Sequence, residues 1–160
     1  MNDIPGLFRE TMATAIPAVM GALVCFSQET INLVFVGSLN QAVPLAAVGM
    51  GNIFINMFGV SIYFGLNGAV DTLVSQANGA KDLRLCGAYL QRGRLLNTVI
   101  YVPILIIFAL SGPLLRSLGQ DAAVSSLAAN YILAYAPGVY FLALYDLQRR
   151  FLIQTGHSDL

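Results

Sequence analysis

Long apolar stretches separated by short polar segments dominate the chain. Four stretches reach the length of about 20 residues that a helix needs to cross the hydrocarbon core of a bilayer. They cover residues 11–37, 43–70, 95–115 and 122–144. Inside lipid each segment must satisfy its own backbone hydrogen bonds, and for single runs of this length only a helix does so. The pattern therefore predicts an all-α membrane protein with about four transmembrane helices.

The composition agrees with this class. Hydrophobic residues make up 57% of the 160 residues and charged residues only 10%, whereas a soluble domain is about 25% charged. Eight basic and eight acidic residues give a net charge of zero, so nothing favours a nucleic-acid partner. The two cysteines, Cys25 and Cys86, lack the spacing of a metal site, and we expect them to be small packing residues without a disulfide.

The longest polar segment, residues 71–94, lies between the second and third spans. Its last part reads LRLCGAYLQRGR, in which leucines and a tyrosine are interspersed with three arginines. That mixture suits a short amphipathic helix in the membrane interface, and it equally suits a helical extension of the third span. The sequence leaves these two alternatives open.

The basic residues predict the orientation. Arg116 alone falls in a segment on one side of the predicted membrane. The others fall on the opposite side: Arg9, Lys81, Arg84, Arg92, Arg94, Arg149 and Arg150. Because basic residues accumulate in cytoplasmic segments, we expect both termini to be cytoplasmic, as an even number of spans also requires.

The first span carries the polar run SQETIN, which includes Gln28, Glu29 and Asn32. An ionisable residue inside a membrane is costly and marks a functional hypothesis. A carboxyl group in surroundings of low dielectric constant can bind and release a proton near neutral pH, and it attracts cations. Asn32 lies one helical turn from both Gln28 and Glu29. Glu29, with Gln28 and Asn32, is therefore the strongest candidate for a substrate- or ion-binding site, although a helix-packing role is the alternative.

A polar stripe follows the second span: Asn52, Asn56, Tyr63, Asn67, Asp71, Ser75 and Asn78. Most neighbours in this stripe are four residues apart, so they share one broad helix face. That face packs against another helix or lines a cavity, and the sequence does not decide between these roles. In the cavity interpretation, Asn56, Tyr63 and Asn67 join Glu29 in binding substrate or ion.

Asp71 lies near the predicted cytoplasmic end of the second span. Lys81 and Arg84 follow it closely in the sequence and are its expected ion-pair partners. We therefore expect Asp71 to be a structural anchor and not a translocation site.

Residues 65–96, GLNGAVDTLVSQANGAKDLRLCGAYLQRGRLL, resemble the eukaryotic branch of the multidrug and toxic compound extrusion (MATE) family. That branch typically carries G-L-x-x-A-x-[DE]-T-x-x-x-Q-x-x-G-A-K at the end of its second helix, followed by Y-L-Q-R. The matching residues are Gly65, Leu66, Ala69, Asp71, Thr72, Gln76, Gly79, Ala80, Lys81, Tyr89, Leu90, Gln91 and Arg92. Residues 118–121 and 137–155 also resemble the family, so the likeness covers nearly the whole chain.

The resemblance implies a secondary antiporter with twelve helices in two lobes. Such proteins export organic cations and xenobiotics in exchange for protons or sodium, without another cofactor, across a plasma or vacuolar membrane. Within the motif it assigns structural roles to Asp71, Gln76, Gly79, Lys81 and Arg92. Since only four spans are present, we expect the chain to be part of the N-terminal lobe of a longer protein, lacking its C-terminal lobe.

One position departs from the family pattern. Many bacterial relatives carry an essential Asp five residues before the glycine that ends the first helix, and this position is Asn32 here. We expect Glu29, one turn away, to take its place.

Three other functions compete with the antiporter. A four-helix exporter that works as a dimer also carries a Glu in its first helix, but the motif at 65–96 and the long polar segment argue against it. A non-transporting scaffold predicts that Glu29→Gln leaves function intact. A lipid-linked sugar flippase calls for basic residues inside the membrane, and the spans contain none. No nucleophile triad, phosphate-binding loop or carboxylate pair indicates an enzyme.

Overall fold

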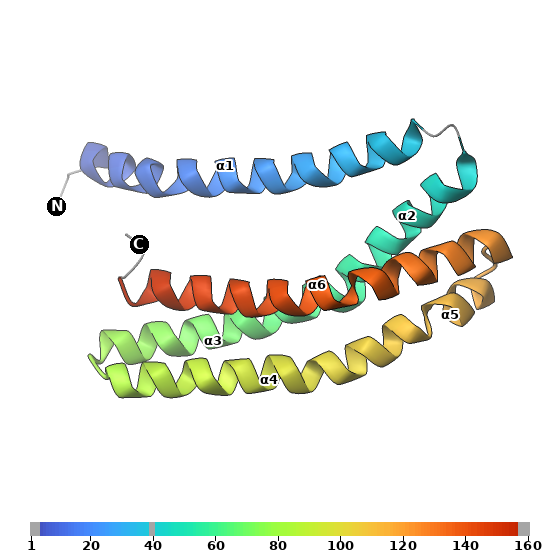
Figure 1. Ribbon diagram of the computed structural model, residues 1–160. Helices are drawn as coiled ribbons and strands as arrows, with labels where there is room; N and C mark the ends of the chain where they lie inside the picture. Colours follow the sequence, from blue (N-terminus) through green and yellow to red (C-terminus); the bar gives the residue numbers. More distant parts are fainter. Residues whose placement is uncertain (1–3, 39–40, 157–160) are drawn as a thin grey trace. The chain divides into compact units, whose positions relative to one another are not determined.

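The computed structural model describes residues 4–38 and 41–156 (Figure 1). Its elements are α1 (Ile4–Gly37), α2 (Ala42–Ile55), the π-helical turn η1 (Asn56–Val60), α3 (Ser61–Gly79), α4 (Leu83–Ala109), α5 (Ser111–Ser117) and α6 (Ala122–Gln154). Within the described residues, four helical segments are long and apolar enough to cross a membrane: Val19–Gly37, Ala42–Gly79, Leu83–Ala109 and Ala122–Gln154. The prediction of an all-α protein with four spans is confirmed.

The chain divides into two compact units, Met1–Leu45 and Ala46–Leu160. In the first unit, α1 forms one continuous helix of 34 residues. The second unit contains most of α2 and the remaining helices.

The second membrane segment continues without a break from α2 through η1 into α3. In η1 the carbonyl oxygen of Asn56 accepts both the Ser61 N–H and the Ser61 hydroxyl, the latter at 2.8 Å. A Cβ atom on Gly59 would lie only 3.0 Å from Phe108 Cζ and 3.1 Å from Val139 Cγ1. Glycine at this position therefore lets the wider π turn lie directly against α4 and α6.

Three helices, α3, α4 and α6, pack against one another along most of their lengths (Figure 1). The larger buried cluster is apolar and is built by α2, α3, α4, α5 and α6: Ala47, Phe54, Ile55, Tyr63, Ile104, Phe108, Leu115, Ala128, Ile132, Ala136, Val139 and Ala143. A smaller cluster lies nearer the α3–α4 turn: Val70, Val74, Ala77, Cys86 and Leu147. Apolar packing thus occurs on both sides of the polar level described below.

The segment LRLCGAYLQRGR forms the first part of α4, so the helical extension is the correct alternative. Before it, Lys81 adopts a left-handed conformation with φ +59°. The N–H groups of Lys81 and Asp82 bond to the carbonyls of Asn78 at 2.9 Å and Ala77 at 3.0 Å, which is the Schellman ending of a helix. Asp82 then caps α4 by accepting the Leu85 N–H at 3.0 Å. Because this turn is so short, α4 begins directly after α3 and leaves no room for a separate interfacial helix.

Candidate functional site

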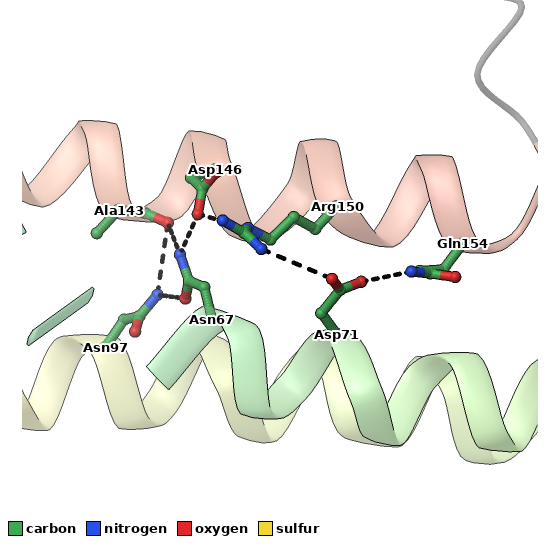
Figure 2. Close-up of polar contacts among 7 residues, drawn as sticks. All are labelled: Asn67, Asp71, Asn97, Ala143, Asp146, Arg150 and Gln154. Carbon is green, nitrogen blue, oxygen red and sulfur yellow. Dashed lines mark hydrogen bonds and ion pairs between the residues drawn. The ribbon is translucent and has the colours of Figure 1, made fainter. Parts of the chain in front are cut away.

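Two buried asparagines form the inner end of a polar network between α3, α4 and α6 (Figure 2). Asn67 and Asn97 are each only 1% exposed. The Asn97 side-chain amide donates to Asn67 Oδ1 at 3.0 Å. Asn67 Nδ2 donates in turn to the carbonyl oxygen of Ala143 and to Asp146 Oδ2, both at 3.0 Å. A side chain from each of α3 and α4 is thereby fixed to α6.

The outer end of the network is charged. Arg150 Nε donates to Asp146 Oδ2 at 2.9 Å, and Arg150 Nη1 lies 3.6 Å from Asp71 Oδ2. Gln154 Nε2 donates to the other oxygen of Asp71 at 2.8 Å. The guanidinium also lies 5.5 Å from the centre of the Phe64 ring. We call this set the polar network: Asn67, Asp71, Asn97, Asp146, Arg150 and Gln154.

Helical spacing explains why α3 and α6 meet through these groups. On α6, Asp146, Arg150 and Gln154 follow one another at four-residue steps, which places them along one face. On α3, Asn67 and Asp71 have the same spacing. Polar side chains aligned in this way would be costly if they faced lipid. Those on α3 and those on α6 instead find their partners on the other helix.

The chemistry of the polar network favours a structural role, holding the helices together, over ligand binding. One guanidinium serves two carboxylates, and the side chains of Asp71, Arg150 and Asp146 are 26%, 28% and 14% exposed. In the part of the chain that the structure describes, no buried side-chain nitrogen or oxygen lacks a hydrogen-bond partner. Ionic groups that satisfy one another in this way hold helices in a fixed register.

The network lies where the hydrophobic parts of three helices end. Hydropathy places the ends of the spans near residues 70, 95 and 144, and the structure brings Asn67, Asn97 and Ala143 into contact. From this level α3, α4 and α6 each continue for about ten residues, or about 15 Å at the helical rise of 1.5 Å. The charged end of the network thus lies beyond the most apolar part of the bundle.

The predicted residues of the first span lie on α1. Gln28, Glu29 and Asn32 are exposed on this helix. Their neighbours Ser27 and Thr30 bond to carbonyls of the same helix, one turn earlier. A contact between Glu29 and the polar stripe of the second span stays a prediction.

The polar stripe divides into buried and exposed members. Tyr63 is 3% exposed, and its hydroxyl lies 3.4 Å from the carbonyl oxygen of Asn97. Asn56 is exposed, and its Nδ2 donates to the carbonyl of Asn52 at 2.9 Å. Asn52 Oδ1 accepts the Tyr131 hydroxyl at 2.8 Å. Tyr63 and Asn67 therefore support the helix-packing interpretation, whereas Asn56 remains open to another molecule.

The family motif builds the end of α3. Gly79 is the last residue of α3 and Lys81 lies in the turn that follows, while the side chains of Gln76 and Arg92 are exposed. The expected pairing of Asp71 with Lys81 or Arg84 is wrong, because Asp71 pairs with Arg150. Lys81 lies in the turn and Arg84 beyond it, whereas α6 returns alongside α3 and presents Arg150 to it.

Sequence reasoning missed three members of the network, although each carries a signal. Asp146 and Gln154 flank Arg150 at four-residue spacing, and Arg150 served only to predict the orientation. Asn97 is the one side-chain amide in the predicted third span, residues 95–115. An isolated amide in a membrane segment indicates a partner on a neighbouring helix.

The chain is similar in sequence to several known proteins. Multidrug and toxin extrusion protein 1 of Oryctolagus cuniculus is 34% identical over 156 residues, which are 98% of this chain and 27% of that protein. The human protein of the same name is 34% identical over 148 residues, covering 92% of this chain and 26% of its own length. Protein DETOXIFICATION 36 of Arabidopsis thaliana is 33% identical over 138 residues, covering 86% of this chain and 27% of its own length.

The chain therefore spans about a quarter of the length of the curated relatives it matches. The model of the MatE family matches residues 17–160. This match begins inside α1 and includes every later helix. Since nearly the whole chain is covered and four of its segments have membrane length, the protein is an integral, multi-pass membrane protein that belongs to the MatE family.

Proposed function

We propose that this chain forms the first part of an antiporter that exports organic cations and other xenobiotics in exchange for protons or sodium. The observation that carries the proposal is its similarity, over nearly its full length, to proteins named for multidrug and toxin extrusion. Because those relatives are about four times longer, the exchange activity belongs to a protein that also contains a C-terminal lobe. The same length difference favours this function over a dimeric four-helix exporter.

Within this function we assign substrate or ion contact to Gln28, Glu29, Asn32 and Asn56. The exposure of Glu29 on α1 supports its role, because the ion pairs found among the described residues do not involve this carboxylate and leave it available to the coupling ion. Tyr63 and Asn67 hold the second span in place against α4 and α6. Both termini are proposed to be cytoplasmic, which places the charged end of the polar network on the cytoplasmic side.

The first experiment is to determine the length of the native product by reading the transcript past Leu160 and sizing the protein in membranes. We expect a product with about eight further hydrophobic spans. A native product that ends near Leu160 would contradict the antiporter proposal and favour an oligomeric exporter or a scaffold.

The second experiment is Glu29→Gln in the full-length protein. We expect loss of efflux driven by a proton or sodium gradient, measured in vesicles with a fluorescent organic cation, and normal insertion into the membrane. Asp82→Asn is the matched control, because it also removes a carboxylate while asparagine still caps α4. Unchanged efflux by Glu29→Gln across the pH range would show that Glu29 is not the coupling residue.

A further inference from the structure

A second polar surface lies apart from the polar network, on the outside of the α4–α6 pair. The Tyr140 hydroxyl and Thr98 Oγ1 are hydrogen-bonded at 3.0 Å. The rings of Tyr101 and Tyr140 pack with their centres 4.8 Å apart. Both tyrosines are half-buried, while Thr98 is exposed. These three side chains therefore form an amphipathic surface across two helices.

Arg94 adds a cation to this surface. It precedes Thr98 by four residues and Tyr101 by seven, so the three residues share one face of α4. The Thr98 hydroxyl also lies 2.9 Å from the Arg94 carbonyl. Arg94 is exposed, and the ion pairs found among the described residues belong to Arg150. We call Arg94, Thr98, Tyr101 and Tyr140 the α4–α6 surface.

The depth of the α4–α6 surface follows from the packing of the two helices. A Cβ atom on Gly93 would lie 3.2 Å from Leu147, so Arg94 is at the level of the charged part of the polar network. Leu105, four residues after Tyr101, continues this face of α4 with an exposed hydrophobic side chain. Val102 and Phe141, which directly follow the two tyrosines in the sequence, are exposed as well. The surface thus changes from a cation through hydroxyl groups to hydrocarbon over a few helical turns. Tyrosines commonly mark this boundary in membrane proteins.

We propose that the α4–α6 surface binds an anionic phospholipid. The order of its groups matches the order of phosphate, glycerol esters and acyl chains along such a lipid. Arg94 binds the headgroup, Thr98 and the two tyrosines face the glycerol region, and the acyl chains lie along the exposed apolar residues. A net negative headgroup is favoured because the two carboxylates of the polar network, Asp71 and Asp146, are already paired with Arg150 and leave the charge of Arg94 for the lipid. This inference is independent of the proposed transport activity.

The test measures lipid retention by the full-length protein, purified in an uncharged detergent, with native mass spectrometry. Phosphatidylglycerol is the anionic probe and phosphatidylcholine the zwitterionic one. We expect phosphatidylglycerol to be retained preferentially, and Arg94→Gln to weaken its retention about fivefold, the effect of one basic residue at an anionic membrane surface.

Arg149→Gln is the matched control. Arg149 is also exposed and carries the same charge at the same end of the bundle, but it follows Tyr140 by nine residues and so lies on the opposite side of α6. We expect this variant to retain phosphatidylglycerol as well as the unaltered protein does. If both variants lost phosphatidylglycerol equally, the lipid would be attracted by positive charge in general and not by this surface, and the proposal would be overturned.

Tyr140→Phe provides a second readout, because it removes the hydroxyl that bonds Thr98 while keeping the ring. We expect weaker retention of phosphatidylglycerol, with a smaller loss than in Arg94→Gln. No preference for the anionic lipid in the unaltered protein would overturn the proposal. Lipid retention that is unchanged by Arg94→Gln would also overturn the proposal. It would indicate that a later part of the protein covers this surface.

Discussion

The second, third and fourth membrane segments are joined in different ways at two levels. In the apolar cluster, Phe54, Phe108 and Val139 interlock by shape alone, and Phe108 is fully buried. In the polar network, Asn67 and Asp146 connect the helices through directed hydrogen bonds. Lipid tails are as apolar as the side chains, so apolar packing between membrane helices depends on close fit and not on exclusion of water. The polar network adds what the apolar cluster lacks, which is a defined register.

The register argument follows from the geometry of the asparagines. Asn67 reaches Ala143 and Asp146 on α6, and Asn97 reaches Asn67 from α4. A rotation or slide of one helix by a single residue would break these bonds together, whereas an apolar cluster can repack. Three substitutions test this difference and a fourth tests the turn between α3 and α4, in order of decreasing expected effect.

Phe108→Ala should have the largest effect, because it leaves a cavity at the centre of the apolar cluster. We expect a loss of about 3–5 kcal/mol in the free energy of unfolding, the usual range for a buried phenylalanine. Reversible unfolding in mixed detergent micelles measures it. Phe141→Ala, at a site 67% exposed, is the control and should change stability by no more than about 0.5 kcal/mol. Similar losses for both variants would contradict the assignment of Phe108 to the core.

Asn67→Leu should come next. It removes the donor to Asp146 and Ala143 and leaves the Asn97 amide only its longer 3.5 Å bond to the Ala143 carbonyl, at an expected loss of about 1–3 kcal/mol. The same unfolding experiment applies. Asn56→Leu is the matched control, since that asparagine is exposed and its amide bonds only to its own helix. If Asn67→Leu proved as stable as the control, the network would contribute no register.

Arg150→Gln should have a smaller effect, because its partners are partly exposed and water can replace some of the lost interaction. We expect a loss of about 1–2 kcal/mol in the free energy of unfolding, because Asp71 and Asp146 then both lose the cation that pairs with them. Arg149→Gln removes the same charge from an exposed site and should be neutral. Measuring both unfolding curves at low and high salt sharpens the comparison, because a loss shared equally by the two variants would be a net-charge effect.

Lys81→Gly should have the smallest effect, and it should stabilise. Lys81 has a φ of +59°, and Gly119 after α5 has a φ of +84° in the same kind of helix ending. A left-handed conformation costs a side-chain-bearing residue about 1 kcal/mol, so Lys81→Gly should gain up to that amount. Gly119→Ala should lose a similar amount. If the free energy of unfolding changed in the same direction in both variants, backbone strain would be ruled out as the cause.

Much of the fold follows from the sequence, and less of the site does. Hydropathy located four spans because a membrane helix must be long and apolar, whatever it packs against. The buried polar residues were recognised only in part: the stripe containing Asn67 and Asp71 was visible at helical spacing, but their partners were not. Arg150 lies 79 residues from Asp71 along the chain, and no local pattern pairs such distant positions.

The sequence by itself determined the membrane class, the four helical segments, the family motif around Asp71 and the polar stripe of the second span. These properties depend on local periodicity and composition. Only the tertiary structure decided that Asp71 pairs with Arg150, that Asn97 supports Asn67, and that residues 83–94 extend α4. The physical reason is that helical periodicity states which face of a helix must be buried, whereas the packing of three helices selects the residue that lies opposite it.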